Sequence, residues 1–184
     1  MLDKMLVEYC APTLSSLKTA NMFSYEFSSN CELESTVQTW NSKLGKKGIS
    51  LHILHRHTQR AVIYVCRNSK LACDLSNRSI QKFLAQFGYT DFTPESCIRL
   101  LKERFAQAHA FPHEIGLFLG YPLADVVGFI ENTGQNYICM GCWKVYCNEC
   151  EAIKLFEMYK KCRDVYTRLF RNRKRSVMQL TVAA

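Results

Sequence analysis

The residues best suited to acid–base chemistry are adjacent in the string FPHEIGLFLGYP, which begins at Phe111. Pro112 favours the first turn of a helix, which would place His113 and Glu114 at the positive end of the helix dipole. A neutral histidine at that position can serve as an acid, a base or a ligand. One interpretation is an enzyme that uses His113 as acid or base, with Glu114 orienting it. The alternative is a tight helical turn in which His113 makes only local contacts.

Two Cys-x-x-Cys pairs follow, formed by Cys139 with Cys142 and by Cys147 with Cys150. Thiolates in paired spacing bind zinc or an iron–sulfur cluster. We expect residues 137–146 to form a strand, in which Cys139 and Cys142 would face opposite sides and Cys142 would lie roughly 16 Å from Cys147. A four-thiolate metal site would require this strand to be broken. Thiol redox chemistry at Cys147 and Cys150 is a narrower alternative, because the start of a helix lowers the pKa of a thiol.

A third interpretation is a binding pocket built from polar residues that interrupt apolar segments. We expect Cys10, Lys18, His113, Tyr121 and Lys144 to contribute polar groups to one pocket for an unidentified small molecule. This pattern favours a small-ligand-binding protein, or an accessory protein that acts on a protein partner. The enzyme and the metal or thiol protein stay open as alternatives.

Cys10 has a second interpretation that depends on where the first helix begins. Pro12 suits the first turn of a helix, so Cys10 would lie just before exposed backbone N–H groups that favour a thiolate. The alternative is a buried cysteine that packs as a small apolar side chain.

Hydrophobic periodicity predicts an α+β fold, in which a small antiparallel sheet of about three strands packs against several helices in a single domain. Two strands are expected near residues 49–53 and 60–66, and the second of these is the more central because its apolar run is nearly continuous. The third strand is expected at residues 137–146. A long final helix should begin with a capping box formed by Asn148 and Glu151. Further helices are expected near residues 32–44, 80–87, 93–105, 112–119 and 122–130.

Composition narrows the class of protein. The chain has 184 residues, of which 48% are hydrophobic and 22% charged, and these fractions exclude a largely disordered protein. No apolar run reaches the roughly 18 residues that a membrane span requires. The start of the chain lacks a basic segment followed by a continuous apolar core, so we expect a cytosolic protein. In a reducing cytosol most of the ten cysteines would be buried thiols.

The positive charge is concentrated near the end of the chain. The net charge is +8, and the residues Arg171, Arg173, Lys174 and Arg175 supply half of it in a short run. We expect residues 1–170 to form the globular domain and residues 171–184 to form a flexible basic tail. Contact with nucleic acid is expected only through this tail, and a solvated tail without a partner is the alternative.

Two strings resemble a known family. They are FPHEIGLFLGYPLADVVGFIENTG, continued by GCWKVY, and CAPTLSSLKTANMF near the start of the chain. Together they are similar to a family of bacterial proteins catalogued as domain of unknown function 3793, over nearly the whole chain except the basic tail. The resemblance implies no particular activity, cofactor or catalytic residue. The matching positions include Cys10, Pro12, Lys18, His113, Glu114, Gly116, Gly120, Tyr121, Pro122, Gly141, Trp143, Lys144 and Tyr146.

Overall fold

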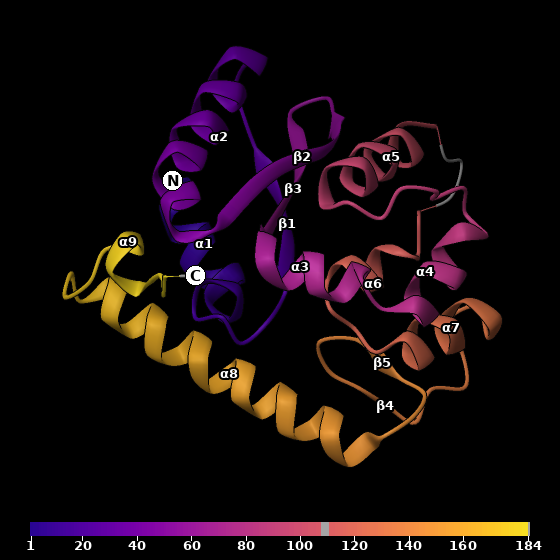
Figure 1. Ribbon diagram of the computed structural model, residues 1–184. Coiled ribbons are helices and arrows are strands. Elements are labelled where there is room, and N and C mark those ends of the chain that lie inside the picture. Colours follow the sequence, from indigo (N-terminus) through magenta and orange to yellow (C-terminus); the bar gives the residue numbers. More distant parts are fainter. Residues whose placement is uncertain (108–110, 184) are drawn as a thin grey trace.

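Three antiparallel strands form the main sheet, in the order β1–β3–β2, at the centre of an α+β domain (Figure 1). The computed structural model describes residues 1–107 and 111–183. The predicted fold class, including the number of strands and the central place of the second predicted strand, is confirmed. The strands are β1 (Ala20–Glu26), β2 (Ile49–His57) and β3 (Arg60–Arg67).

The two faces of the sheet contribute to two separate groups of packed side chains. Along β3, Ile63 and Val65 face one group, whereas Tyr64 and Cys66 face the other, as the alternation of side chains along a strand requires. Both faces are therefore buried, which explains the nearly continuous apolar run of this strand.

One face of the sheet is covered by the first two helices and the end of the chain. The long helix α8 runs beneath α1 along the lower edge of the molecule in Figure 1. Its apolar stripe packs there because Tyr166, Leu169 and Phe170 share one side of the helix. The elements of this layer are α1 (Leu2–Leu14), α2 (Asn30–Leu44), the short 3₁₀ helix η1 (Gly45–Lys47), α8 (Glu149–Arg171) and α9 (Val177–Leu180).

The opposite face is covered by helices from the middle of the chain. The hydroxyl of Tyr64 on β3 donates a hydrogen bond of 2.7 Å to the carbonyl of Phe118, which ties this layer to the sheet. The helices are α3 (Asn68–Leu75), α4 (Arg78–Ala85), α5 (Pro94–Gln107), α6 (Ile115–Phe118) and α7 (Leu123–Glu131).

The third strand differs from the prediction. It is β1, whereas residues 137–146 fold back as a small hairpin, in which β4 (Cys139–Met140) pairs with β5 (Lys144–Val145). The turn includes Gly141, where a Cβ atom would overlap the ring of Phe156 on α8. Glycine, which lacks a Cβ atom, allows the backbone of this turn to lie directly against the ring.

The beginnings of two helices also differ from the prediction. α1 begins at Leu2, and Pro12 lies in its last turn. The apolar residues Leu2, Leu6 and Cys10 recur at helical spacing before Pro12, and their burial explains the early start. At the start of α8, Asn148 has a positive φ of 50° and its side chain makes no capping hydrogen bond, so the predicted capping box is wrong.

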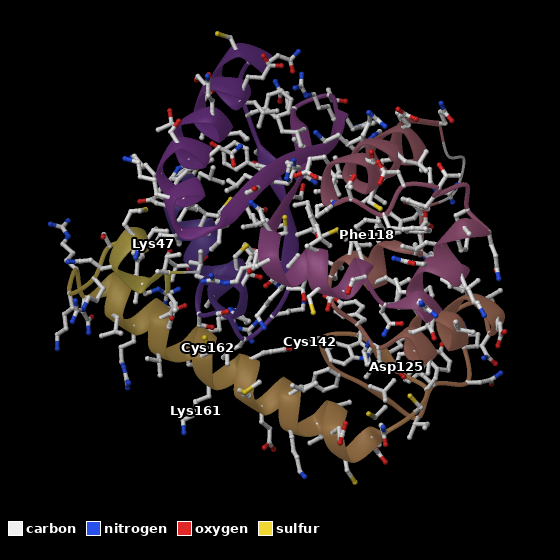
Figure 2. The ribbon with its side chains drawn as sticks, in the orientation of Figure 1. Lys47, Phe118, Asp125, Cys142, Lys161 and Cys162 are labelled. Atoms are coloured by element: carbon white, nitrogen blue, oxygen red, sulfur yellow. The ribbon has the colours of Figure 1, made fainter. Side chains whose placement is uncertain are left out.

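The end of the chain folds back onto the domain and is not a free tail from residue 171. Val177 and Leu180 of α9 are buried, and a capping box of Ser176 and Gln179 begins this short helix. Lys47 donates to the carbonyl of Thr181 at 2.6 Å, and Figure 2 shows Lys47 beside this end of the chain. The flexible-tail prediction overlooked the apolar residues that follow the basic run, and these side chains pack against the core.

Candidate functional site

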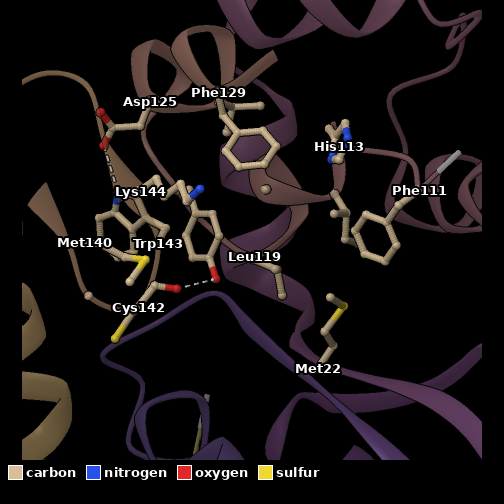
Figure 3. Close-up of a pocket in the computed structure, with 15 residues that line it drawn as sticks. Met22, Phe111, His113, Leu119, Asp125, Phe129, Met140, Cys142, Trp143 and Lys144 are labelled. Carbon is tan, nitrogen blue, oxygen red and sulfur yellow. Dashed lines mark hydrogen bonds between the residues drawn. The ribbon is translucent and has the colours of Figure 1, made fainter. Parts of the chain in front are cut away.

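A cavity of about 330 Å³ lies between α6, α7 and the hairpin, with β1 contributing one side chain. In the close-up of Figure 3, Phe111 and His113 stand on one side and Met140, Trp143 and Lys144 on the other. The walls are mainly apolar and aromatic. The lining residues are Met22, Phe111, His113, Ile115, Gly116, Leu119, Tyr121, Asp125, Val126, Phe129, Met140, Gly141, Cys142, Trp143 and Lys144.

A buried carboxylate on α7 holds the hairpin against the cavity. Asp125, which is 2% exposed, accepts hydrogen bonds from the indole Nε1 of Trp143 at 2.8 Å and from the backbone N–H groups of Tyr146 at 2.7 Å and Cys147 at 3.0 Å. Three donors directed at one carboxylate compensate for its burial. Asp125 therefore determines where the Trp143 ring forms the cavity wall.

Tyr121 forms the part of the wall that follows α6. Its ring stacks on the ring of Trp143, with the centroids 4.8 Å apart and an angle of 27° between the planes. Its hydroxyl donates to the backbone carbonyl of Cys142 at 3.3 Å. Burial raises the pKa of Tyr121 to about 12, and the neighbouring Cys142 thiol adds to this effect. Tyr121 is therefore a hydrogen-bond donor at neutral pH.

Lys18 supports Tyr121 from outside the cavity. Its ammonium lies 4.8 Å from the centre of the Tyr121 ring, and the side chain is almost fully buried. Burial lowers the pKa of Lys18 to about 8, although the nearby thiols of Cys142 and Cys10 partly oppose the shift. This lysine contacts the wall of the cavity without lining it.

Lys144 presents its ammonium at the cavity between two aromatic rings. The nitrogen lies 4.8 Å from the centre of the Tyr137 ring and 5.8 Å from that of Phe129. It donates to the carbonyl of Gly134 at 2.7 Å. An ammonium has three donors, and within residues 1–107 and 111–183 only this one has a hydrogen-bond acceptor.

His113 lies at the rim of the cavity, apart from Glu114. Its ring is exposed and lies 5.0 Å from that of Phe129 and 5.9 Å from that of Phe111. Glu114 is buried beneath it and forms an ion pair with Arg104. The structure does not bring the two side chains together, because Glu114 is directed into the core by this pair.

A tyrosine completes the surroundings of Glu114. The hydroxyl of Tyr89 donates to its carboxylate at 3.4 Å. Burial raises the pKa of Tyr89, and the Glu114 charge adds to the shift. Arg104 and Tyr89 therefore hold Glu114 in the core, and its side chain does not line the cavity.

Of the polar residues predicted to share one pocket, three line it. These are His113, Tyr121 and Lys144, and Lys18 adjoins them through Tyr121. Cys10 does not line the cavity: it is fully buried within α1, where burial raises the pKa of its thiol. Of the two interpretations of Cys10, the structure agrees with the buried cysteine that packs as an apolar side chain, because α1 begins well before Pro12.

The four cysteines of the predicted metal or redox site are divided by the hairpin and by Asp125. Cys142 lies in the hairpin turn, and the thiol of Cys147 donates to Asp125 at 3.5 Å. Partial burial, together with the Asp125 carboxylate, raises the pKa of Cys147, the opposite of the expected shift. Within residues 1–107 and 111–183, no three His, Cys, Asp or Glu side chains are grouped so that they could hold a metal ion.

The site residues that sequence reasoning missed are Asp125, Trp143, Phe129, Met22 and Met140. One signal was present for Asp125, a single acidic residue within the apolar string LADVVGFI. A carboxylate in such a string is almost never fully buried unless hydrogen bonds satisfy it.

The fold and the cavity define a single-domain α+β protein with an aromatic pocket that a lysine and a histidine border. The chain belongs to the family described as "Protein of unknown function (DUF3793)", whose model matches residues 6–181. No curated protein and no solved structure matches the chain. In the described part of the chain, no helix is both long and apolar enough to cross a membrane.

Proposed function

We propose that this protein binds a small, planar, mainly apolar molecule that carries an anionic group, as a ligand-binding or accessory protein. The observation that carries the proposal is the aromatic cavity with the Lys144 ammonium at its wall. Its volume of about 330 Å³ lies within the range of small-molecule sites, which combine apolar walls with a few polar groups.

The chemistry of the walls selects the class of ligand. Trp143, Phe129 and Phe111 offer ring faces and edges for offset or edge-to-face contacts with a flat molecule. Met22 and Met140 are flexible and polarisable, so they adapt to the outline of the ligand. The two free donors of Lys144 would meet the anionic group, and His113 at the rim would supply another polar contact.

The first experiment uses two matched fluorescent probes. Anilinonaphthalene sulfonate combines aromatic rings with an anion, whereas N-phenyl-1-naphthylamine has the same rings without the sulfonate. We expect one molecule of the sulfonate to bind per chain, about tenfold more tightly than the neutral probe, equivalent to about 1.4 kcal/mol. Equal affinity for the two probes would refute an anion site.

Two variants locate the bound probe. Met22→Trp should fill the cavity and weaken both probes, whereas Lys144→Met should weaken only the sulfonate. The matched controls are Met158→Trp and Lys154→Met on the exposed side of α8, which should leave both affinities unchanged. If the cavity variants bind like their controls, the probe lies elsewhere and the proposal fails.

The alternative of acid–base catalysis by His113 with Glu114 receives less support, since Glu114 is paired with Arg104.

A cytosolic location stays part of the proposal. It is supported by Cys10, Cys66 and Cys97, which are fully buried thiols within the apolar core.

A further inference from the structure

Nearly all of the net charge of this protein lies on one surface. Residues 160–176 contain eight basic side chains and one acidic side chain, a net charge of +7 out of +8 for the whole chain. All eight basic side chains are exposed. We call them the basic surface; its members are Lys160, Lys161, Arg163, Arg168, Arg171, Arg173, Lys174 and Arg175.

Four of the first five members share one side of α8. With 3.6 residues per turn, Lys160, Lys161, Arg168 and Arg171 fall within roughly 100° around the helix axis, whereas Arg163 lies at the edge of this side, one turn after the buried Tyr159. Figure 2 shows Lys161 directed away from the body of the protein. The distance from Lys160 to Arg171 along the helix is roughly 16 Å.

The last three members are held by the backbone that joins α8 to α9. The N–H of Arg173 donates to the carbonyl of Phe170 at 2.9 Å, and the N–H of Lys174 donates to that of Leu169 at 3.0 Å. The docked helix α9 then anchors the far end of this connection. The basic side chains therefore project from a backbone of defined shape, which lowers the entropy cost of binding compared with a free tail.

Few of these charges are neutralised within the protein. Arg171 pairs with Glu8 at 2.9 Å, and among residues 1–107 and 111–183 no other member has a carboxylate within 4.0 Å. Lys4 of α1, whose ammonium lies 3.9 Å from the same Glu8 carboxylate, adds a further cation, because it lines a hollow of about 420 Å³ together with Arg171, Arg173 and Arg175. A group of cations that outnumbers its carboxylates repels itself, and a polyanion would relieve this repulsion.

We propose that the basic surface binds the phosphate backbone of a nucleic acid, without selecting its sequence and independently of the aromatic cavity. Five of its eight members are arginines, whose planar guanidinium groups pair with phosphate oxygens through two hydrogen bonds. No aromatic residue of this segment is exposed for stacking on bases, since Tyr166 and Phe170 are half-buried against the core.

An anionic membrane fits this surface less well. Helices that lie on a bilayer carry exposed Trp, Phe or Leu beside their basic residues. The exposed large apolar side chains nearest in sequence to the basic surface are Met158 and Val182, one at each end. A nucleic acid, which requires only charge and hydrogen bonding, is therefore the partner that we propose.

The test measures fluorescence anisotropy of a labelled DNA duplex of about 20 base pairs and of a single-stranded RNA of similar length, at salt concentrations from about 50 to 200 mM. If about five phosphates are contacted, the logarithm of affinity should fall against the logarithm of salt with a slope of roughly −4. Vesicles of phosphatidylserine and phosphatidylcholine form the third arm. Binding to vesicles without binding to either nucleic acid would overturn the proposal.

A pair of matched triple variants tests the location. Replacing Arg173, Lys174 and Arg175 by glutamate should weaken binding more than roughly tenfold and reduce the salt slope by about three units. The control replaces three exposed cations elsewhere by glutamate, so that the net charge changes by the same amount. This control should alter the affinity by less than about twofold at 0.1 M salt, because charges distant from the binding site are screened. The control residues are Arg78, Lys82 and Arg99. An equal loss in both triple variants would show a response to net charge alone and would contradict the proposal.

A variant with a smaller change of charge separates a loss of nucleic-acid binding from a loss of folding. Replacing Arg173, Lys174 and Arg175 by glutamine removes the charges without creating new repulsion. Binding of the sulfonate probe to the aromatic cavity should stay unchanged in this variant, which shows that it is folded. If the glutamine variant binds nucleic acid like the natural chain, the basic surface is not the binding site.

Discussion

Arg67 and Asp125 are both buried charges, but they hold their surroundings in different ways. Arg67 at the end of β3 donates to the carbonyls of Thr13 and Leu14, both at 2.8 Å, and to that of Val182 at 2.7 Å. It thereby satisfies carbonyls at the end of α1, where a positive charge is favourable, and ties the end of the chain to the sheet.

Asp125 binds donors where Arg67 binds acceptors. Its carboxylate receives the indole N–H of Trp143 and the backbone N–H groups of Tyr146 and Cys147. The elements that Arg67 joins are long and pack through large apolar faces. The hairpin that Asp125 holds has strands of two residues each, so this carboxylate supplies much of its stability. Loss of Arg67 should therefore weaken the whole fold, whereas loss of Asp125 should also dismantle the cavity.

The largest effect is expected for Asp125→Ala. Three buried donors lose their acceptor, so we expect a loss of about 4 kcal/mol in the free energy of unfolding, measured with urea. Binding of the sulfonate probe should be lost as well. The control Asp164→Ala, on the exposed side of α8, should change stability by less than about 0.5 kcal/mol. A cavity that still binds the probe in Asp125→Ala would contradict the role given to this carboxylate.

Arg67→Met should cost less and act differently. Methionine fills part of the space but removes three hydrogen bonds from a charged donor, although the carbonyls of Thr13 and Leu14 each keep a backbone N–H donor. We expect a loss of about 3 kcal/mol. The folded fraction should still bind the probe with unchanged affinity. Arg60→Met, which breaks an exposed ion pair with Glu26, should cost at most about 1 kcal/mol. Loss of probe binding in folded Arg67→Met would remove the distinction between the two regions.

Acid should weaken the sheet region through His52 on β2. Burial, with a smaller contribution from Lys102, lowers the pKa of His52 to about 4, although Glu95 partly opposes the shift. Because the unfolded chain binds this proton near pH 6.5, stability should fall as the pH decreases from about 6.5 to 4. We expect this term to reach about 2 kcal/mol, since His52 keeps some exposure.

The variant His52→Gln isolates this term. Urea unfolding at several pH values should show a smaller loss on acidification than in the natural chain, and the difference should vanish above about pH 7. Parallel pH dependence in both chains would show that His52 does not contribute.

The smallest effect is expected for Gly128→Ala on α7. A Cβ atom there would lie 2.5 Å from Cγ of Tyr146, so the hairpin must shift. Alanine favours a helix over glycine, which offsets part of the cost, and we expect a net loss of about 1 kcal/mol with weaker probe binding. At Gly45, a new Cβ would have no atom of the described residues within 4 Å, so Gly45→Ala should leave probe binding unchanged.

Sequence patterns predicted the elements whose periodicity is strong. The apolar run of β3 and the stripes of α2 and α5 each bury a regular face, and that face is visible in the order of residue types. β1 was not predicted, since its seven residues mix Ser24 and Asn21 with apolar side chains. It becomes a strand through pairing with β3, a partner about 40 residues away that local pattern does not reveal.

The candidate site was predicted in part. His113, Tyr121 and Lys144 were expected to share a pocket because they interrupt apolar strings, and they line the same cavity. The path of residues 137–146 could not be predicted, since it depends on hydrogen bonds to Asp125 and on the contact of Gly141 with Phe156. The hydrogen bonds to Asp125 join residues that are 18 to 22 positions apart. Phe156 lies on α8, 15 positions after Gly141. Local sequence patterns do not reveal contacts at these separations.

The most direct test of the proposed cavity uses the indole N–H signals of the two tryptophans in a nitrogen-15 correlation spectrum. Trp143 lines the cavity, whereas Trp40 packs against the other face of the sheet. The variant Trp143→Phe assigns the two signals. We predict that the sulfonate probe shifts the Trp143 signal until one molecule is bound per chain and leaves that of Trp40 in place. A shift of Trp40 alone, or no shift of Trp143 at saturation, would contradict a ligand site in this cavity.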